Sequence, residues 1–198
     1  MSGGNTDARR RQIMEAVIDL TVEGGLPAAT FRTIAEHAGV SVRLVQYYFG
    51  DKDRLLADTL AFVGREAAHR IAMALGEVDT SSPRDVVRTI CQQFLPIDEE
   101  RRRAMLVFIA FRTAALTDSS LASSQTLGLA ESLIATFRQQ LETATPNRPA
   151  EELESEAILL VSALTGLANM MLAGEATSEA VLRHVEFAID RSMLDPAR

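Results

Sequence analysis

Arg43, Gln46 and Tyr47 form a short cluster of polar and aromatic side chains within SVRLVQYYFGDKDR, residues 41–54. An arginine can donate two hydrogen bonds to a guanine edge, and a glutamine can read an adenine edge or bind a phosphate. At helical spacing, these residues and Val42 share one face of a helix. The pattern predicts a surface that reads double-stranded DNA.

Residues suited to phosphate contacts flank this cluster. Hydroxyl and ammonium groups bind phosphate oxygens, and helix starts at Thr30 and Ser41 would add backbone N–H donors. The arginine run at 9–11 precedes the body of the first predicted helix and can reach the flanking backbone or minor groove. The predicted DNA contacts are Arg9, Arg10, Thr30, Thr33, Ser41, Val42, Arg43, Gln46, Tyr47, Tyr48 and Lys52.

Two short helices must hold these side chains in place. Ala35 lies four residues before Gly39, and Val45 follows six residues after it. A small residue permits close helix packing, and glycine adopts the positive φ of a sharp turn. Apolar residues would fill the wedge between the helices: Ile34, Ala38, Val40 and Val45. This spacing predicts a helix-turn-helix whose second helix enters the major groove.

The rest of the chain shows helical spacing and no long strand-like alternation. Glycine pairs, prolines and Ser or Thr caps mark the helix ends, as at Gly24-Gly25 and Ser82-Pro83. The fold class is therefore predicted as all-α, with helices near 7–23, 30–37, 42–48, 51–75, 83–96, 98–116, 121–143, 150–174 and 177–193.

The N-terminal residues resemble the tetracycline-repressor (TetR) family. That family has the pattern T-x-x-x-I-A-x-x-A-G-V-S followed by F-x-x-K-x-x-L. Here the matching residues are Thr30, Ile34, Ala35, Ala38, Gly39, Val40, Ser41, Phe49, Lys52 and Leu55. The resemblance covers about residues 9–60, and the nine-helix layout agrees with the family over the remainder.

One position departs from the family pattern. Where the family usually has a phosphate-binding tyrosine, this chain has Gln46, followed by Tyr47 and Tyr48. The phosphate role can pass to either tyrosine or to Gln46. The LVQYYF variant resembles a branch that includes choline-responsive BetI-type repressors. Scattered aromatic residues and the absence of tryptophan give no recognisable cage for a quaternary ammonium, so choline is not predicted.

The resemblance implies two domains: a DNA-binding domain at 1–56, and a ligand-binding and dimerisation domain at 57–198. The predicted pocket residues are aromatic, polar or flexible: Phe62, Phe94, Phe108, Phe111, Arg112, Phe137, Thr165, Asn169 and Met170. Arg112 suits an anionic ligand group, an internal carboxylate or a snorkelling position. Thr165 and Asn169 can instead satisfy neighbouring groups, and the aromatic residues and Met170 can instead be ordinary core.

The last two helices are the predicted homodimer interface. The segment from Ala157 to Ala173 is apolar around most of its circumference, so both of its faces need cover. The predicted interface residues lie at helical spacing: Leu160, Leu164, Leu167, Met171, Val181, Val185 and Ile189. Two helices from each subunit would form a four-helix interface. An ordinary intramolecular core is the alternative.

Composition and motifs exclude several other classes of protein. The net charge of -7 argues against a non-specific polyanion binder, although residues 1–56 are themselves neutral overall. The isolated histidines and the single cysteine, Cys91, predict no metal, no cofactor and no enzyme. One cysteine and a polar N-terminus predict a cytoplasmic protein without a membrane span.

These patterns predict a ligand-responsive transcriptional regulator. It would be a homodimer that represses from operator DNA and is released by a small-molecule effector. The alternative is an all-α small-molecule-binding or scaffold protein that has lost operator binding.

Overall fold

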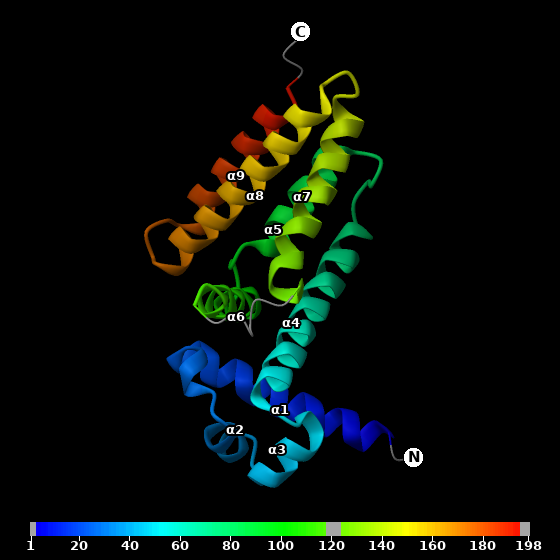
Figure 1. Cartoon of the computed structure of the whole chain (residues 1–198). Helices are drawn as coiled ribbons and strands as arrows, with labels where there is room; N and C mark the ends of the chain where they lie inside the picture. The colour runs from blue at the N-terminus through cyan, green and yellow to red at the C-terminus, as the bar shows by residue number, and fades with distance from the viewer. Residues whose placement is uncertain (1–2, 118–123, 195–198) are drawn as a thin grey trace. The chain divides into compact units, whose positions relative to one another are not determined.

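The computed structural model describes residues 3–117 and 124–194, and these residues form helices and no β-strand. The α-helices are α1 (Gly3–Gly24), α2 (Phe31–His37), α3 (Val42–Phe49), α4 (Lys52–Leu75), α5 (Pro83–Phe94), α6 (Glu99–Ala115), α7 (Ser124–Ala144), α8 (Ala150–Leu172) and α9 (Ser178–Ser192). Figure 1 shows their order along the chain. The all-α prediction is confirmed, and each predicted helix has its counterpart.

Small differences lie at the helix ends. A 3-10 turn, Leu26–Ala28, follows α1 and was not predicted. The predicted start of α7 near residue 121 lies outside the described residues. Predicted caps are present: the side chains of Ser82 and Thr177 accept from the backbone N–H of Asp85 and Ala180. Gly25 ends α1 with φ of 72°.

The helices form two compact units. Of the described residues, the first contains 3–65, 103–117 and 124–127, and the second contains 66–102 and 128–194. The boundary falls inside α4, between Arg65 and Glu66, and inside α6, between Arg102 and Arg103. The predicted division at 56/57 remains a prediction about domains, whereas the packing units divide elsewhere.

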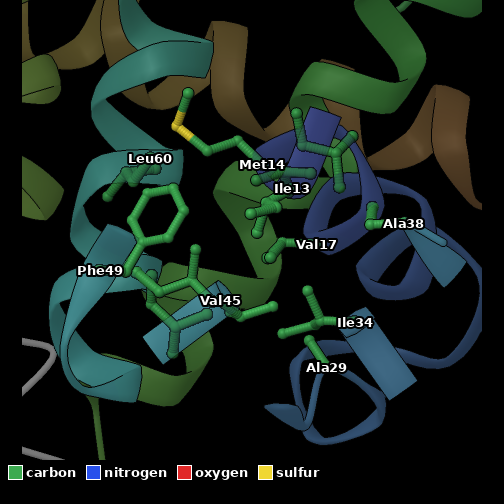
Figure 2. Packing of buried hydrophobic residues seen from close by; sticks show 14 of the residues in the cluster. Ile13, Met14, Val17, Ala29, Ile34, Ala38, Val45, Phe49 and Leu60 are labelled. Atoms are coloured by element: carbon green, nitrogen blue, oxygen red, sulfur yellow. The ribbon is translucent and has the colours of Figure 1, made fainter. Parts of the chain in front are cut away.

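The first unit has one apolar core beneath the predicted DNA-reading helices. Figure 2 shows α1 residues Ile13 and Val17 packed with Ile34, Val45 and Phe49 from α2 and α3. All five are no more than 1 % exposed. α4 adds Leu55, Leu56, Leu60 and Val63, and α6 adds Val107 and Phe111 to the same cluster. The reading helices are therefore held by α1, α4 and α6 together.

The second unit packs α9 against both α5 and α8. α8 is long and apolar enough to cross a membrane by length and composition, the one such helix among the described residues. One of its faces is buried within the unit by Leu153, Ala157, Leu160, Leu164 and Ala168. We interpret α8 as a core helix whose other face remains open.

Candidate nucleic-acid interface

Gly39 joins α2 to α3 with a positive φ of 60°. The N–H of Val40 donates to Ala35 O at 2.9 Å, and the N–H of Gly39 donates to Glu36 O at 3.2 Å. This pair of bonds is the Schellman motif, which satisfies the free carbonyls at a helix end. The predicted turn is confirmed.

Both helices begin with a side-chain cap. The hydroxyl of Thr30 accepts from the N–H of Thr33 at 3.2 Å, and Thr33 Oγ1 accepts from the N–H of Thr30 at 2.9 Å. The hydroxyl of Ser41 accepts from the N–H of Leu44 at 3.2 Å. These caps fix where α2 and α3 start, and they leave further N–H groups available to an anion.

The two faces of α3 differ in burial. Val45 and Phe49 are buried against the core, while Val42 is 38 % and Tyr47 80 % exposed. Arg43 and Gln46 are also exposed. The structure thus brings these four predicted DNA-contact residues onto one open face. The Tyr47 ring meets the half-buried Tyr48 ring edge-on, with centroids 5.4 Å apart.

Three basic side chains on this surface have no carboxylate partner among the described residues. Among the described residues, no ion pair engages Arg32, Arg43 or Lys52. An arginine without a carboxylate partner keeps its donors for a ligand. The acidic chain therefore presents unpaired cations where DNA contact is predicted.

Arg10 makes contacts within the protein that the sequence analysis did not predict. Its guanidinium donates to Tyr48 O at 2.7 Å and to Asp58 Oδ2 at 2.6 Å. It also lies over the Phe49 ring, 4.4 Å from the centroid. These contacts join α1 to α3 and α4, so Arg10 is engaged inside the protein. Arg9 donates to Gln12 on the same helix at 2.8 Å.

The predicted pocket residues are placed as follows. Phe111 and Phe137 are at most 2 % exposed and belong to the cores of different units. Phe62, Phe94 and Phe108 are half-buried. Phe62 and Phe108 pack on the core of the first unit. These positions agree with the alternative that some of the aromatic residues are core.

The remaining members of that set are exposed or satisfied within their own helix. Arg112, Asn169 and Met170 are exposed. Thr165 donates to Val161 O of its own helix at 2.8 Å, which satisfies its hydroxyl. Arg112 shares a helix with apolar residues but lies on the solvent side, so it needs no buried partner.

Most of the predicted dimer residues lie inside the protomer. Leu160, Leu164, Val181, Val185 and Ile189 are at most 6 % exposed, and Leu167 and Met171 are half-buried. They bury the contact between α8 and its neighbours, as the alternative of an intramolecular core requires.

Sequence reasoning missed most of the exposed apolar residues on the same helices and assigned Met170 to the pocket instead. Ile158 is 44 %, Leu159 62 % and Met170 41 % exposed on α8, and Phe187 is 66 % exposed on α9. Small residues accompany them on α8: Ser162, Ala163 and Gly166 are exposed. Because α8 is apolar on all sides, periodicity alone could not decide which face the protomer buries.

Cys91, the single cysteine, is not a reactive thiol. Cys91 is 2 % exposed. Burial, with a smaller effect of the Glu186 charge, raises the pKa of the Cys91 thiol to about 12. Such a thiol stays protonated and unreactive at neutral pH.

Comparison with known proteins gives a consistent result. The family described as "BetI-type transcriptional repressor, C-terminal" matches residues 83–193, and "Bacterial regulatory proteins, tetR family" matches residues 13–59. The "HTH-type transcriptional regulator BetI" of Burkholderia lata is 29% identical over 94% of this chain and 95% of its own length.

Solved structures show the same fold. A transcriptional regulator from Rhodococcus sp. RHA1 has a TM-score of 0.74 at 28% identity, covering 93% of each chain. A TetR-family regulator from Rhodococcus sp. has a TM-score of 0.79 at 21% identity, covering 94% of this chain and 98% of its own.

Proposed function

Because the chain belongs to the TetR family of transcriptional regulators and has a BetI-type C-terminal domain, we propose that it is a ligand-responsive repressor. It binds operator DNA as a homodimer through α2 and α3, and a small-molecule effector releases it. The observation that carries this proposal is the open face of α3, where Arg43, Gln46 and Tyr47 are exposed beside capped helix starts.

We assign the DNA contacts from the exposure of each side chain and from its hydrogen-bond partners within the protein. Val42, Arg43, Gln46 and Tyr47 face the base edges from α3, since their side chains are exposed on its outer face. Thr30, Thr33, Ser41, Tyr48 and Lys52 hold the backbone on either side. Arg10 supports this surface from inside through Tyr48 and Asp58. Phosphate contacts set position, and base contacts set sequence preference.

The open strip of α8 and α9 is the proposed dimer surface. Leu159, Met170 and Phe187 supply apolar area, and Ala163 and Gly166 allow two helices to approach closely. An isologous contact buries the same strip on both subunits. Two heads would then read major-groove faces about one DNA turn, or roughly 34 Å, apart.

The effector site belongs to residues 57–198. Its proposed lining uses the half-buried aromatic residues Phe62 and Phe108, which pack on the core of the first unit. Because Arg112 is exposed, its position does not support a buried site for an anionic ligand. The family assignment supports a small-molecule effector, while its chemical class is left to ligand screening against the intact protein.

Fluorescence anisotropy with duplexes that flank the protein's own gene tests DNA binding. We expect saturable binding that weakens as salt rises, because counterions are released from each neutralised phosphate. Replacing Arg43 and Tyr47 together with alanine should weaken binding at least about tenfold, since one base contact contributes about 1–3 kcal/mol.

The matched control is Arg102→Ala, which removes one positive charge from α6, where Arg102 lies 3.7 Å from Glu99. It should bind as the wild type does. If no flanking duplex binds saturably at low salt, the alternative of an all-α protein without an operator is supported instead.

A further inference from the structure

Asp19, in the C-terminal part of α1, contacts two other helices. Its Oδ2 lies 3.1 Å from Nε2 of His37, the last residue of α2. Its Oδ1 accepts from Nη2 of Arg103 on α6. One carboxylate therefore joins the end of the first reading helix to a helix from much later in the chain.

Arg103 is the polar end of a longer contact. Residues 103, 107 and 111 are four apart and share one face of α6. Val107 is 0% and Phe111 2% exposed within the core that contains Ile13 and Val17 of α1. Val107 and Phe111 therefore anchor this face of α6 in the same core as α1. The Arg103 guanidinium is thereby placed at Asp19.

The other end of the link meets the turn that sets the angle of α3. His37 directly precedes Ala38 and Gly39, where the Schellman motif reverses the chain. Gln12, also on α1, donates from Nε2 to Ala38 O at 2.8 Å. Asp19 and Gln12 thus hold this turn from one helix, at positions two turns apart.

We propose that Arg103 and Asp19 are positioning residues for DNA binding, through which α6 controls the setting of α2, the turn and α3. The proposal rests on the function proposed above and adds a means of regulating the same surface. When Arg103 is paired, Asp19 is fixed and the turn is held in its DNA-reading arrangement. Withdrawing Arg103 frees that carboxylate, and the turn loses one of its two supports.

The test measures operator affinity of the full-length protein after Arg103→Gln and, separately, Asp19→Asn. Each should weaken binding about threefold to tenfold, the range expected for residues coupled in one network. The double variant should bind DNA no more weakly than the weaker-binding single variant, because both changes break the same ion pair between Arg103 and Asp19. Thermal unfolding must confirm that all variants are folded at the assay temperature.

Arg102→Gln is the control on the neighbouring residue. The Arg102 side chain is 46% exposed and lies 3.7 Å from Glu99 of its own helix, so its loss should leave affinity unchanged. A charge exchange, Asp19→Lys with Arg103→Glu, should restore affinity at pH 8. A role limited to overall stability would not predict that recovery.

Hydrogen exchange locates the effect. In Arg103→Gln, the amides of α2 and residues 38–41 should lose protection, while those of α9 should not. The inference is overturned if wild type binds DNA and Arg103→Gln binds equally well, or if Arg102→Gln is equally impaired. Absence of wild-type binding to any flanking duplex would instead overturn the proposed function, and this inference with it.

Discussion

Gly39 sets the angle between the two reading helices through its backbone alone. A β-carbon at this position would meet no atom within 4 Å, yet the residue has φ of +60°. Replacing it with alanine therefore creates no clash and forces an unfavourable left-handed conformation. We expect Gly39→Ala to lower the free energy of unfolding by about 1 kcal/mol. Urea denaturation measures this.

Gly64 provides the matched control. It lies within α4, and a β-carbon there also meets nothing within 4 Å. Its φ is not positive. Gly64→Ala should leave stability unchanged or raise it by up to about 1 kcal/mol, since alanine is the better helix former. Equal losses in both variants would contradict the conformational explanation.

Arg10 and Arg43 show where residue-level prediction ends. Both were predicted to contact DNA, and both are arginines near the reading helices. Arg10 is bound to Tyr48 O and Asp58, whereas Arg43 is exposed. Asp58 lies 48 residues from Arg10 along the chain. A partner so distant in sequence leaves no local pattern, so sequence spacing could not separate the two.

At the scale of elements, the start of α6 depends on Asp98. Its Oδ1 accepts from the N–H of Arg101 at 2.8 Å, and its Oδ2 accepts from Arg101 Nη2 at 2.7 Å. Arg101 Nη1 also donates to Gln92 O at 2.9 Å. The cap therefore starts α6 and ties that start to the end of α5.

Asp98→Ala should lower stability at neutral pH by about 1 kcal/mol, as for the loss of a helix cap. The side-chain hydrogen bond from Arg101, and then its backbone N–H, hold the pKa of Asp98 below its usual value of 3.8. The stabilisation is therefore complete above about pH 4 and is lost as pH falls through the lower folded pKa. Thermal unfolding of both proteins from pH 7 to pH 3 measures the difference.

That difference should shrink in acid. Glu99→Ala is the control, because it removes a carboxylate from the same turn without removing the cap. A constant difference between wild type and Asp98→Ala at every pH would show that the carboxylate charge does not contribute.

Helix existence and caps could be predicted because their signals are local. Thr30, Ser41, Ser82 and Thr177 each accept a hydrogen bond from the third residue after them. The face that α8 buries could not be predicted in the same way. Its residues are apolar all round, and only the packing of α5 and α9 decides that Leu160 is inside and Leu159 outside.

At the scale of the whole molecule, the exposed strip on α8 and α9 predicts self-association. Leu159→Arg places a charge where the proposed dimer excludes water, so it should shift the protein from dimer to monomer. Sedimentation velocity measures the change, and operator affinity should fall with it because two heads no longer bind together.

Leu116→Arg is the control for surface charge alone. Leu116 is 85 % exposed on the other packing unit and lies outside the strip. It should leave the sedimentation coefficient unchanged. A wild-type protein that sediments as a monomer at micromolar concentration would contradict the proposed interface.

Val107 and Phe111 of α6 complete the core on which α1 to α3 pack, although they lie about sixty residues beyond the last base-reading side chain. Chimaeras that join this protein's reading head to the C-terminal half of another regulator must respect that arrangement. With a splice at residue 56, the transplanted reading head would pack against the α6 of another protein, whose side chains do not match its core. Residues 103–115 should therefore travel with the head.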